Sequence, residues 1–188
     1  MSKYLNRILV LDVEAICSSS RYTEIISVGL TEVDLMKLKI VESNVIYVKP
    51  TTMRICDRTT RLTGLTPDFI DENGITFKEA CEILRDKFIT DKKSIFGWGN
   101  FDYDIFCEQS KEEDIKNPIN KNYYNLQNLI GLRSAMWGGN NSSLGLKEAL
   151  DLFKMEFEGT PHCAKADSFN TAKLALRIFE EIKSGAKK

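Results

Sequence analysis

Short apolar runs rich in β-branched residues dominate the first 50 positions of the chain. Residues 8–14 (ILVLDVE) are almost continuously apolar and turn acidic at their end, which is typical of a buried central strand. Residues 24–34 and 38–48 have strand-like composition and flank the polar segment 35–37. This part of the chain therefore predicts three antiparallel strands.

Helical periodicity governs most of the remaining chain. The apolar positions of residues 76–88 recur on one helical face, and Thr76 with Glu79 three residues later predicts a capping box at the start. Further helices are predicted from the same kind of pattern. They span 57–62, 101–109, 129–137 and 144–153, and a long helix closes the chain.

Residues 93–98 and 123–126 are short apolar segments between these helices, and they predict a fourth and a fifth strand. Strands first, then helices interleaved with strands, indicate an α/β fold with a mixed five-stranded sheet flanked by helices. A length of 188 residues suits one domain. We expect that domain to span residues 1–183, with residues 184–188 as a frayed tail.

Composition narrows the range of functions. With 43% hydrophobic and 28% charged residues, the chain is neither disordered nor fibrous. Its 26 basic and 27 acidic residues give a net charge of -1, so any contact with nucleic acid must be local. The five cysteines form no C-x-x-C pair, which favours reduced thiols.

Residues 1–6 lack the apolar stretch of a signal peptide, and no segment has the length and apolar character of a membrane span. We therefore expect a soluble, cytoplasmic protein without a membrane partner. No long apolar surface stripe is visible in the sequence, which favours a monomer.

Asp12 and Glu14 are the first candidates for chemistry. Two positions apart on a strand, their side chains leave the same face. Most D-x-E pairs merely mark the point where a strand reaches solvent. At the end of a buried strand, however, two carboxylates repel each other and resist burial unless a cation lies between them, and a hard divalent metal is the natural choice.

Asp102 follows the apolar segment 93–98 at the start of a predicted helix, where ligands of α/β sheets gather. Local sequence equally allows a helix cap at this position. Asp104, two residues on, competes for the same functional role. We favour Asp102.

His162 is the only histidine in the chain and lies in a predicted loop, and Asp167 follows five residues later near the final helix. A single loop histidine is usually a surface residue. In its functional interpretation His162 is a general base, because an imidazole pKa of roughly 6.5 suits proton removal near neutral pH. Asp167 is then a further candidate ligand.

Three motifs occur in order: D-V-E at 12–14, W-G-N-F-D at 98–102 and H-C-A-K-A-D at 162–167. Together they resemble the three motifs of DEDDh 3′-5′ exonucleases, which have the DnaQ-like RNase H fold. D-V-E-A-I-C at 12–17 and L-T-G-L-T at 62–66 are similar to the branch that contains the enhanced-RNAi and histone-mRNA-end exonucleases and the KapD-like proteins.

This resemblance implies a site in which four acids hold two Mg²⁺ or Mn²⁺ ions while a histidine activates water. The implied residues are Asp12, Glu14, Asp102 and Asp167 as ligands, His162 as the base, and Ala15, Leu65 and Phe101 as substrate contacts. The implied reaction releases nucleoside 5′-monophosphates from the 3′ end of single-stranded RNA or DNA, and the branch favours RNA. Ala15 departs from the broader class, which often has a hydroxyl side chain there.

Two alternatives share this fold. One is a proofreading-type exonuclease acting on DNA ends, and the other is a nucleic-acid-binding module without turnover. Further surface contacts are conceivable at Lys92 and Lys93, Lys116, Lys121 and Trp137, although scattered lysines are usually solvated and a helix-end tryptophan is more often in the core.

Overall fold

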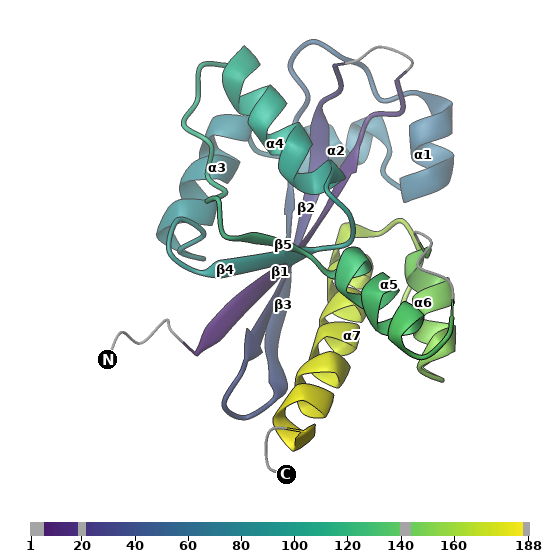
Figure 1. Ribbon diagram of the computed structural model, residues 1–188. Helices are drawn as coiled ribbons and strands as arrows, with labels where there is room; N and C mark the ends of the chain where they lie inside the picture. The colour runs from purple at the N-terminus through teal and green to yellow at the C-terminus, as the bar shows by residue number, and fades with distance from the viewer. Residues whose placement is uncertain (1–5, 19–21, 140–143, 186–188) are drawn as a thin grey trace.

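The computed structural model describes residues 6–18, 22–139 and 144–185. At its centre lies one five-stranded sheet with the strand order β3-β2-β1-β4-β5 (Figure 1). The strands are β1 (Arg7–Ala15), β2 (Ile25–Asp34), β3 (Lys39–Tyr47), β4 (Ser94–Gly97) and β5 (Tyr123–Asn125). The first three pair antiparallel, whereas β4 is parallel to β1 and β5 to β4. The predicted mixed sheet with three antiparallel strands first is confirmed.

Helices cover both faces of this sheet (Figure 1). They are α1 (Asp57–Thr63), α2 (Pro67–Asn73), α3 (Phe77–Asp86), α4 (Phe101–Glu112), α5 (Leu126–Met136), α6 (Leu146–Leu152) and α7 (Ala164–Gly185). The predicted capping box of Thr76 and Glu79 is present at the start of α3. Helix α7 ends two residues beyond the predicted boundary at 183, and residues 186–188 lie outside the described part of the chain.

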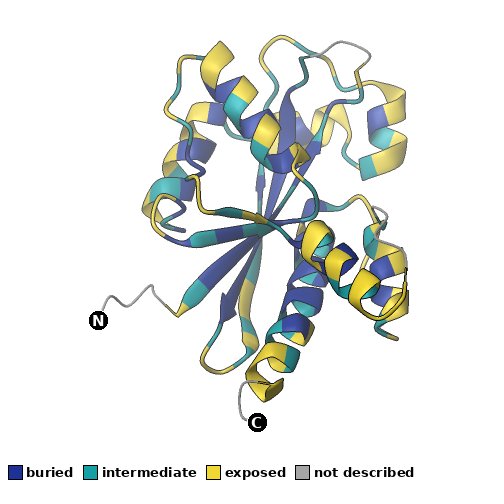
Figure 2. Cartoon of the chain, in the orientation of Figure 1, coloured by how far each residue is buried: buried dark blue, intermediate teal, exposed yellow. Residues whose placement is uncertain are grey.

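Strand β1 is buried on both of its faces, as Figure 2 shows for the centre of the sheet. Leu9 and Leu11 belong to the core cluster that includes side chains of α3 and α4. Ile8 and Val10 pack on the other face with Ala172 of α7. This burial explains the continuous apolar run at the start of the chain, and it places the next even-numbered residue, Asp12, on the face of α7.

Two helix starts differ from those predicted. Helix α2 was not expected, although Thr66 caps it through the Phe69 N–H and Pro67 occupies a first-turn position where proline is favoured. Helix α5 begins at Leu126, not at residue 129, because the Asn125 side chain accepts a hydrogen bond from the Asn128 N–H. In both cases a side-chain cap, not apolar periodicity, decides where the helix begins.

Two of the surface residues considered from the sequence have other surroundings. Lys93 is only 5% exposed and pairs with Glu32, which also pairs with Arg7, so Lys93 is not available to a phosphate. The interpretation of Trp137 as a core residue is wrong, because its side chain is 81% exposed. In the described ranges, no helix is both long enough and apolar enough to cross a bilayer.

Candidate active site

Three carboxylates meet at the end of β1. Asp12 and Glu14 project from β1 toward the first turn of α7, which carries Asp167. Each of the three acids offers one ligand oxygen, and these oxygens all lie within 4.8 Å of one another. Residues separated by more than 150 positions therefore form one anionic cluster.

Gly29 allows α7 to come this close to the sheet. It pairs with Asp12 across the β1–β2 ladder. A Cβ atom at Gly29 would overlap the carbonyl oxygen of Ala164, the first residue of α7. The start of α7 thus lies directly on the β2 backbone beside Asp12, which brings Asp167 into the cluster. Our sequence interpretation did not include Gly29, since an isolated glycine in a strand carries no pattern that names its neighbour.

Asp102 contributes a fourth carboxylate from the start of α4. It is 4% exposed, and its Oδ1 accepts a hydrogen bond of 3.1 Å from the Val13 N–H, 89 residues away on β1. This bond to another element argues against a role as the cap of its own helix, where Asn100 holds the N-cap position. Asp104 is exposed to solvent. The geometry therefore favours Asp102 over Asp104.

Tyr123 is a site residue that the sequence did not reveal. Its hydroxyl lies 2.9 Å from the Gly99 carbonyl oxygen and 3.4 Å from Asp102 Oδ2, and it shares its one proton between these two acceptors. Gly97 makes room for it, because a Cβ atom there would overlap the tyrosine hydroxyl. Tyr123 and the Val13 N–H thus hold the Asp102 carboxylate from two sides.

Replacement of Tyr123 by phenylalanine is expected to lower kcat about fivefold and to leave KM unchanged, because a hydrogen bond of this kind contributes about 1 kcal/mol. The matched control is Tyr124→Phe, since Tyr124 is half-exposed and stacks on Phe96 away from the carboxylates. Steady-state kinetics on both variants decides the point. An equal loss in the two variants would show that Tyr123 has no special role.

Burial and mutual repulsion disfavour ionisation of the cluster. Burial, with repulsion from Asp167 and Asp102, raises the pKa of Glu14 to about 8. Burial raises the pKa of Asp102 to about 7, although the two hydrogen bonds it accepts favour its charged form. The pKa of Asp12 is raised well above its ordinary value by burial and by the neighbouring carboxylates. Burial and like charge both disfavour the ionised carboxylates, and too little positive charge lies nearby to offset them.

A divalent cation would supply the positive charge that the carboxylate cluster lacks. Of the lysines and arginines in the described ranges, none forms an ion pair with any of the four acids. Hard cations such as Mg²⁺ and Mn²⁺ prefer oxygen ligands, and carboxylates are their usual protein ligands. Oxygens of Asp12 and Glu14 on β1 and of Asp167 on α7 lie close enough to share one ion. The donor set therefore fits the divalent metals that the sequence predicts.

His162 lies beside this cluster in the loop that leads into α7. Its backbone is left-handed, with φ of 61°, and its side chain is exposed. Burial raises the pKa of Asp167 to about 6, while the nearby charge of His162 opposes the rise. An exposed imidazole next to a buried carboxylate can exchange protons with water and substrate.

The three predicted substrate contacts lie on segments that border the cluster. Ala15 ends β1, next to an irregularity in the β1–β2 register after Glu14. Phe101 immediately precedes Asp102 and is 55% exposed. Leu65 is half-buried and follows the left-handed Gly64 at the end of α1.

Helix α1 is tied to the end of β1 by a hydrogen bond. Thr59 of α1 accepts it from the Cys17 N–H at 2.9 Å. The turn at Leu65 therefore lies on an element anchored three residues beyond Glu14. The roles of Ala15, Leu65 and Phe101 stay predictions.

Comparison with known sequences gives one family. The profile of the exonuclease family RNase_T matches residues 9–175. The human protein named 3′-5′ exoribonuclease 1 is 25% identical over 193 residues, which cover 95% of this chain and 54% of the human protein. The chain thus spans about half the length of the curated relatives it matches.

Comparison with solved structures gives the same fold. The nuclease domain of 3′hExo, a DEDDh family member bound to rAMP, superposes with a TM-score of 0.82 at 24% identity, covering 96% of this chain and 95% of that domain. A 3′-exonuclease solved for its 3′-end-specific recognition of a histone mRNA stem-loop superposes with a TM-score of 0.80 at 25% identity, covering 96% and 65%.

Proposed function

Because this chain belongs to the RNase_T exonuclease family, we propose that it removes nucleotides from the 3′ end of single-stranded RNA in a divalent-metal-dependent reaction. The single observation that carries the proposal is the convergence of acids from β1, α4 and α7 beside one exposed histidine. RNA is preferred to DNA because the human relative is named an exoribonuclease and a similar nuclease domain was solved with rAMP.

Asp12, Glu14, Asp102 and Asp167 are the residues that would hold the metal ions. When bound, divalent cations supply positive charge to a scissile phosphodiester and to its attacking and leaving oxygens. The protein's own contribution is to fix four carboxylates before substrate arrives. Asp102 is held by hydrogen bonds from Val13 and Tyr123, and Asp167 is held in place by the packing of α7 on the sheet. Such preorganisation avoids reorganisation cost during the reaction.

His162 would act as the general base. Its imidazole removes a proton from the attacking water, and the adjacent Asp167 carboxylate attracts the imidazolium that results. The water oxygen attacks phosphorus directly, the bond to the 3′ oxygen of the preceding nucleotide breaks, and a nucleoside 5′-monophosphate leaves. The 3′ oxygen takes up a proton from solvent, and the imidazolium returns its proton to solvent. No covalent enzyme intermediate is required.

Leu65 and Phe101 would contact the last bases of the strand. Apolar and aromatic side chains bind single strands without strong sequence preference, because every base offers a flat apolar face. The exposure of Phe101 beside Asp102 supports this role. Ala15 has no hydroxyl, so it would contact the terminal nucleotide through its backbone and methyl group only.

The deciding experiment uses a short RNA labelled at its 5′ end, with Mg²⁺ or Mn²⁺. We expect a ladder of products shortened one nucleotide at a time from the 3′ end, free nucleoside 5′-monophosphates, and full inhibition by EDTA. His162→Gln is expected to lose about 10²-fold to 10⁴-fold in kcat, the usual contribution of a general base.

Asp102→Asn and Asp104→Asn form a matched pair for this assay. The two residues are neighbours on α4, but only Asp102 is buried in the cluster. We expect activity to be lost in the first variant and kept in the second. A ladder that persists in His162→Gln and Asp102→Asn, or faster degradation of DNA than of RNA, would contradict the proposed activity or substrate.

A further inference from the structure

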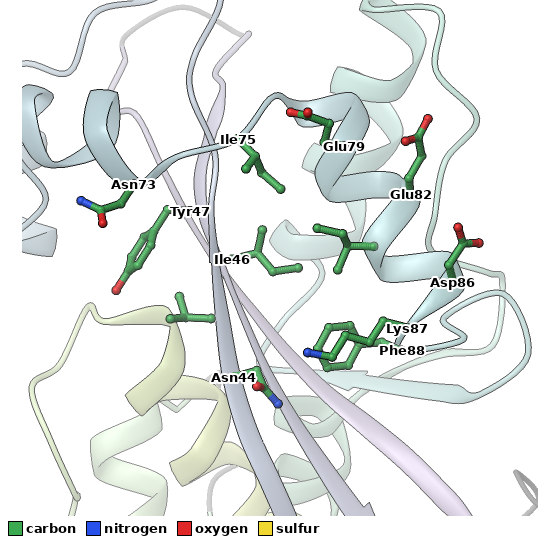
Figure 3. A pocket seen from close by; sticks show the side chains of 12 residues that line it. Asn44, Ile46, Tyr47, Asn73, Ile75, Glu79, Glu82, Asp86, Lys87 and Phe88 are labelled. Carbon is green, nitrogen blue, oxygen red and sulfur yellow. The ribbon is translucent and has the colours of Figure 1, made fainter.

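A cavity lies between β3 and α3, on segments that contribute none of the predicted catalytic residues. It has a volume of about 700 Å³ (Figure 3). Apolar side chains form its floor, namely Ile46, Ile75, Ile83 and Phe88. The β3 backbone around Val45 and Tyr47 forms one wall, and α3 forms the opposite one. We refer to this cavity as the β3 groove.

Strand β3 is one of the two edge strands of the sheet, so one side of its backbone lacks a neighbouring strand of the sheet. Ile75 occupies the first position on that side. It forms a parallel bridge with Val48, donates to the Tyr47 carbonyl at 3.0 Å and accepts from the Lys49 N–H at 2.8 Å. After Ile75 the chain turns into α3. In the described part of the chain, the backbone pairing along this edge of β3 is thus limited to one residue, Ile75.

The backbone next to Tyr47 continues the same open edge. In an antiparallel strand the N–H and C=O of one residue point to the same side, and the side alternates along the chain. Because the Tyr47 carbonyl points toward Ile75, the backbone groups of Val45 and Ser43 also point outward. Within the described part of the chain, no other segment hydrogen-bonds to them there.

The α3 wall of the β3 groove is acidic. Glu79, Glu82 and Asp86 are spaced at three and four residues, so they share one side of α3, and Figure 3 shows their carboxylates along it. Lys87 lies over the Phe88 ring, with its Nζ 5.2 Å from the ring centroid. Glu79 is engaged by Thr76 and has Lys49 nearby, so the free negative charge of this wall comes mainly from Glu82 and Asp86. This charge repels a polyanion such as RNA and attracts a cationic ligand.

We propose that the β3 groove binds an extended basic segment of a partner protein, which pairs with β3 as an additional strand. Its backbone continues the pairing that Ile75 begins, and alternate side chains serve two purposes. Because alternate side chains of a strand point to opposite faces of the sheet, lysine or arginine side chains on the α3 face lay their apolar stems over Ile46 and Phe88 and reach Glu82 and Asp86. The apolar residues between them point to the other face. The groove is separate from the carboxylate cluster, so the bound segment leaves the active site open.

A peptide of eight residues that alternates valine with lysine, labelled with fluorescein, is a direct probe. We expect saturable binding by fluorescence anisotropy, and slower amide hydrogen exchange at Val45 and Ser43 when the peptide is bound. The same peptide with glutamate in place of lysine tests charge. A version N-methylated on alternate amides tests strand pairing, because it keeps the side chains and loses the donors.

Two double variants form a matched pair, and each reverses the charge of two acidic side chains on one helix. Glu82→Lys with Asp86→Lys changes the exposed side of α3 at a spacing of four residues, and Glu108→Lys with Glu112→Lys does the same on α4. We expect the first pair to weaken binding at least about tenfold and the second to change it less than about twofold. Both proteins should keep wild-type exonuclease activity, which verifies folding.

Three results would overturn the proposal: no saturable binding of the valine-lysine peptide to the wild-type protein, equal affinity for the N-methylated peptide, or equal weakening by both pairs of reversals. The peptide measurements do not depend on the exonuclease reaction, so they test the groove whatever the substrate of the active site is.

Discussion

Asp12→Asn is expected to lower the exonuclease rate by about a thousandfold or more, and in metal-free buffer to raise the melting temperature. The rate falls because one ligand of the cluster is lost, and metal ions contribute several kcal/mol to charge stabilisation in such reactions. Stability rises because burial and the neighbouring carboxylates, which both raise the pKa of Asp12, disfavour its charged form in the native state. A neutral amide removes that repulsion.

The direction of the pH dependence follows from the same groups. The pKa of Glu14 rises from 4.5 to about 8, so the metal-free native state retains protons that the unfolded chain has released between these values. Stability of the metal-free protein therefore falls as pH rises from about 5 to about 8. Added Mn²⁺ should reverse this loss in the wild-type protein, since binding to the native state alone stabilises it.

Thermal unfolding with and without Mn²⁺, at several pH values, checks this prediction. Asp104→Asn is the matched control, because it removes one exposed carboxylate from α4 and leaves the cluster intact. We expect Mn²⁺ to stabilise this control as it stabilises the wild-type protein, and to stabilise Asp12→Asn much less. A melting temperature of Asp12→Asn that falls in metal-free buffer would contradict the account of a repulsive cluster.

Gly29→Ala is expected to lower kcat about 10²-fold. The added methyl group cannot coexist with the Ala164 carbonyl, so the first turn of α7 must move by roughly 1 Å, a displacement that costs about this much in rate. Asp167 and His162 move with that turn. The overlap should also destabilise the protein by about 1 to 3 kcal/mol, the usual cost of overpacking.

Gly185→Ala is the control for this substitution, because Gly185 is also in α7 and its Cβ would meet no atom within 4 Å. Kinetics should be measured well below the melting temperature of both variants, across a Mn²⁺ titration. A positioning role predicts a lower kcat and a higher Mn²⁺ requirement with KM for the RNA little changed. If stability alone falls and kcat is normal for folded protein, Gly29 does not position the site.

The local sequence was sufficient to predict the five strands and most of the helices. The run at 8–14 predicts a buried strand because β1 is covered on both faces, by α3 and α4 on one and by α7 on the other. Helix α2 escaped prediction although Thr66 and Pro67 mark its start, because seven residues carry too little apolar periodicity. Helix α5 was placed three residues late because the Asn125 cap, not an apolar period, sets its start.

The sequence by itself determined which residue types were available for catalysis and in what order they occur. Two acids on one strand face, an acid at a helix start and a histidine near a final acid are local features. They follow from the side-chain period of a strand and from the ends of helices, so they can be seen without the fold.

Only the tertiary structure decided how close these residues come and what holds them there. The sequence already favoured Asp102 over Asp104, but the physical distinction between them is a bond to Val13, 89 residues away. The supporting roles of Gly29 and Tyr123 depend on the approach of one backbone or side chain to another segment. These contacts join positions far apart in the chain. Gly29 acts through the side chain that it lacks and Tyr123 through one hydroxyl group, and neither feature leaves a periodic pattern in the sequence.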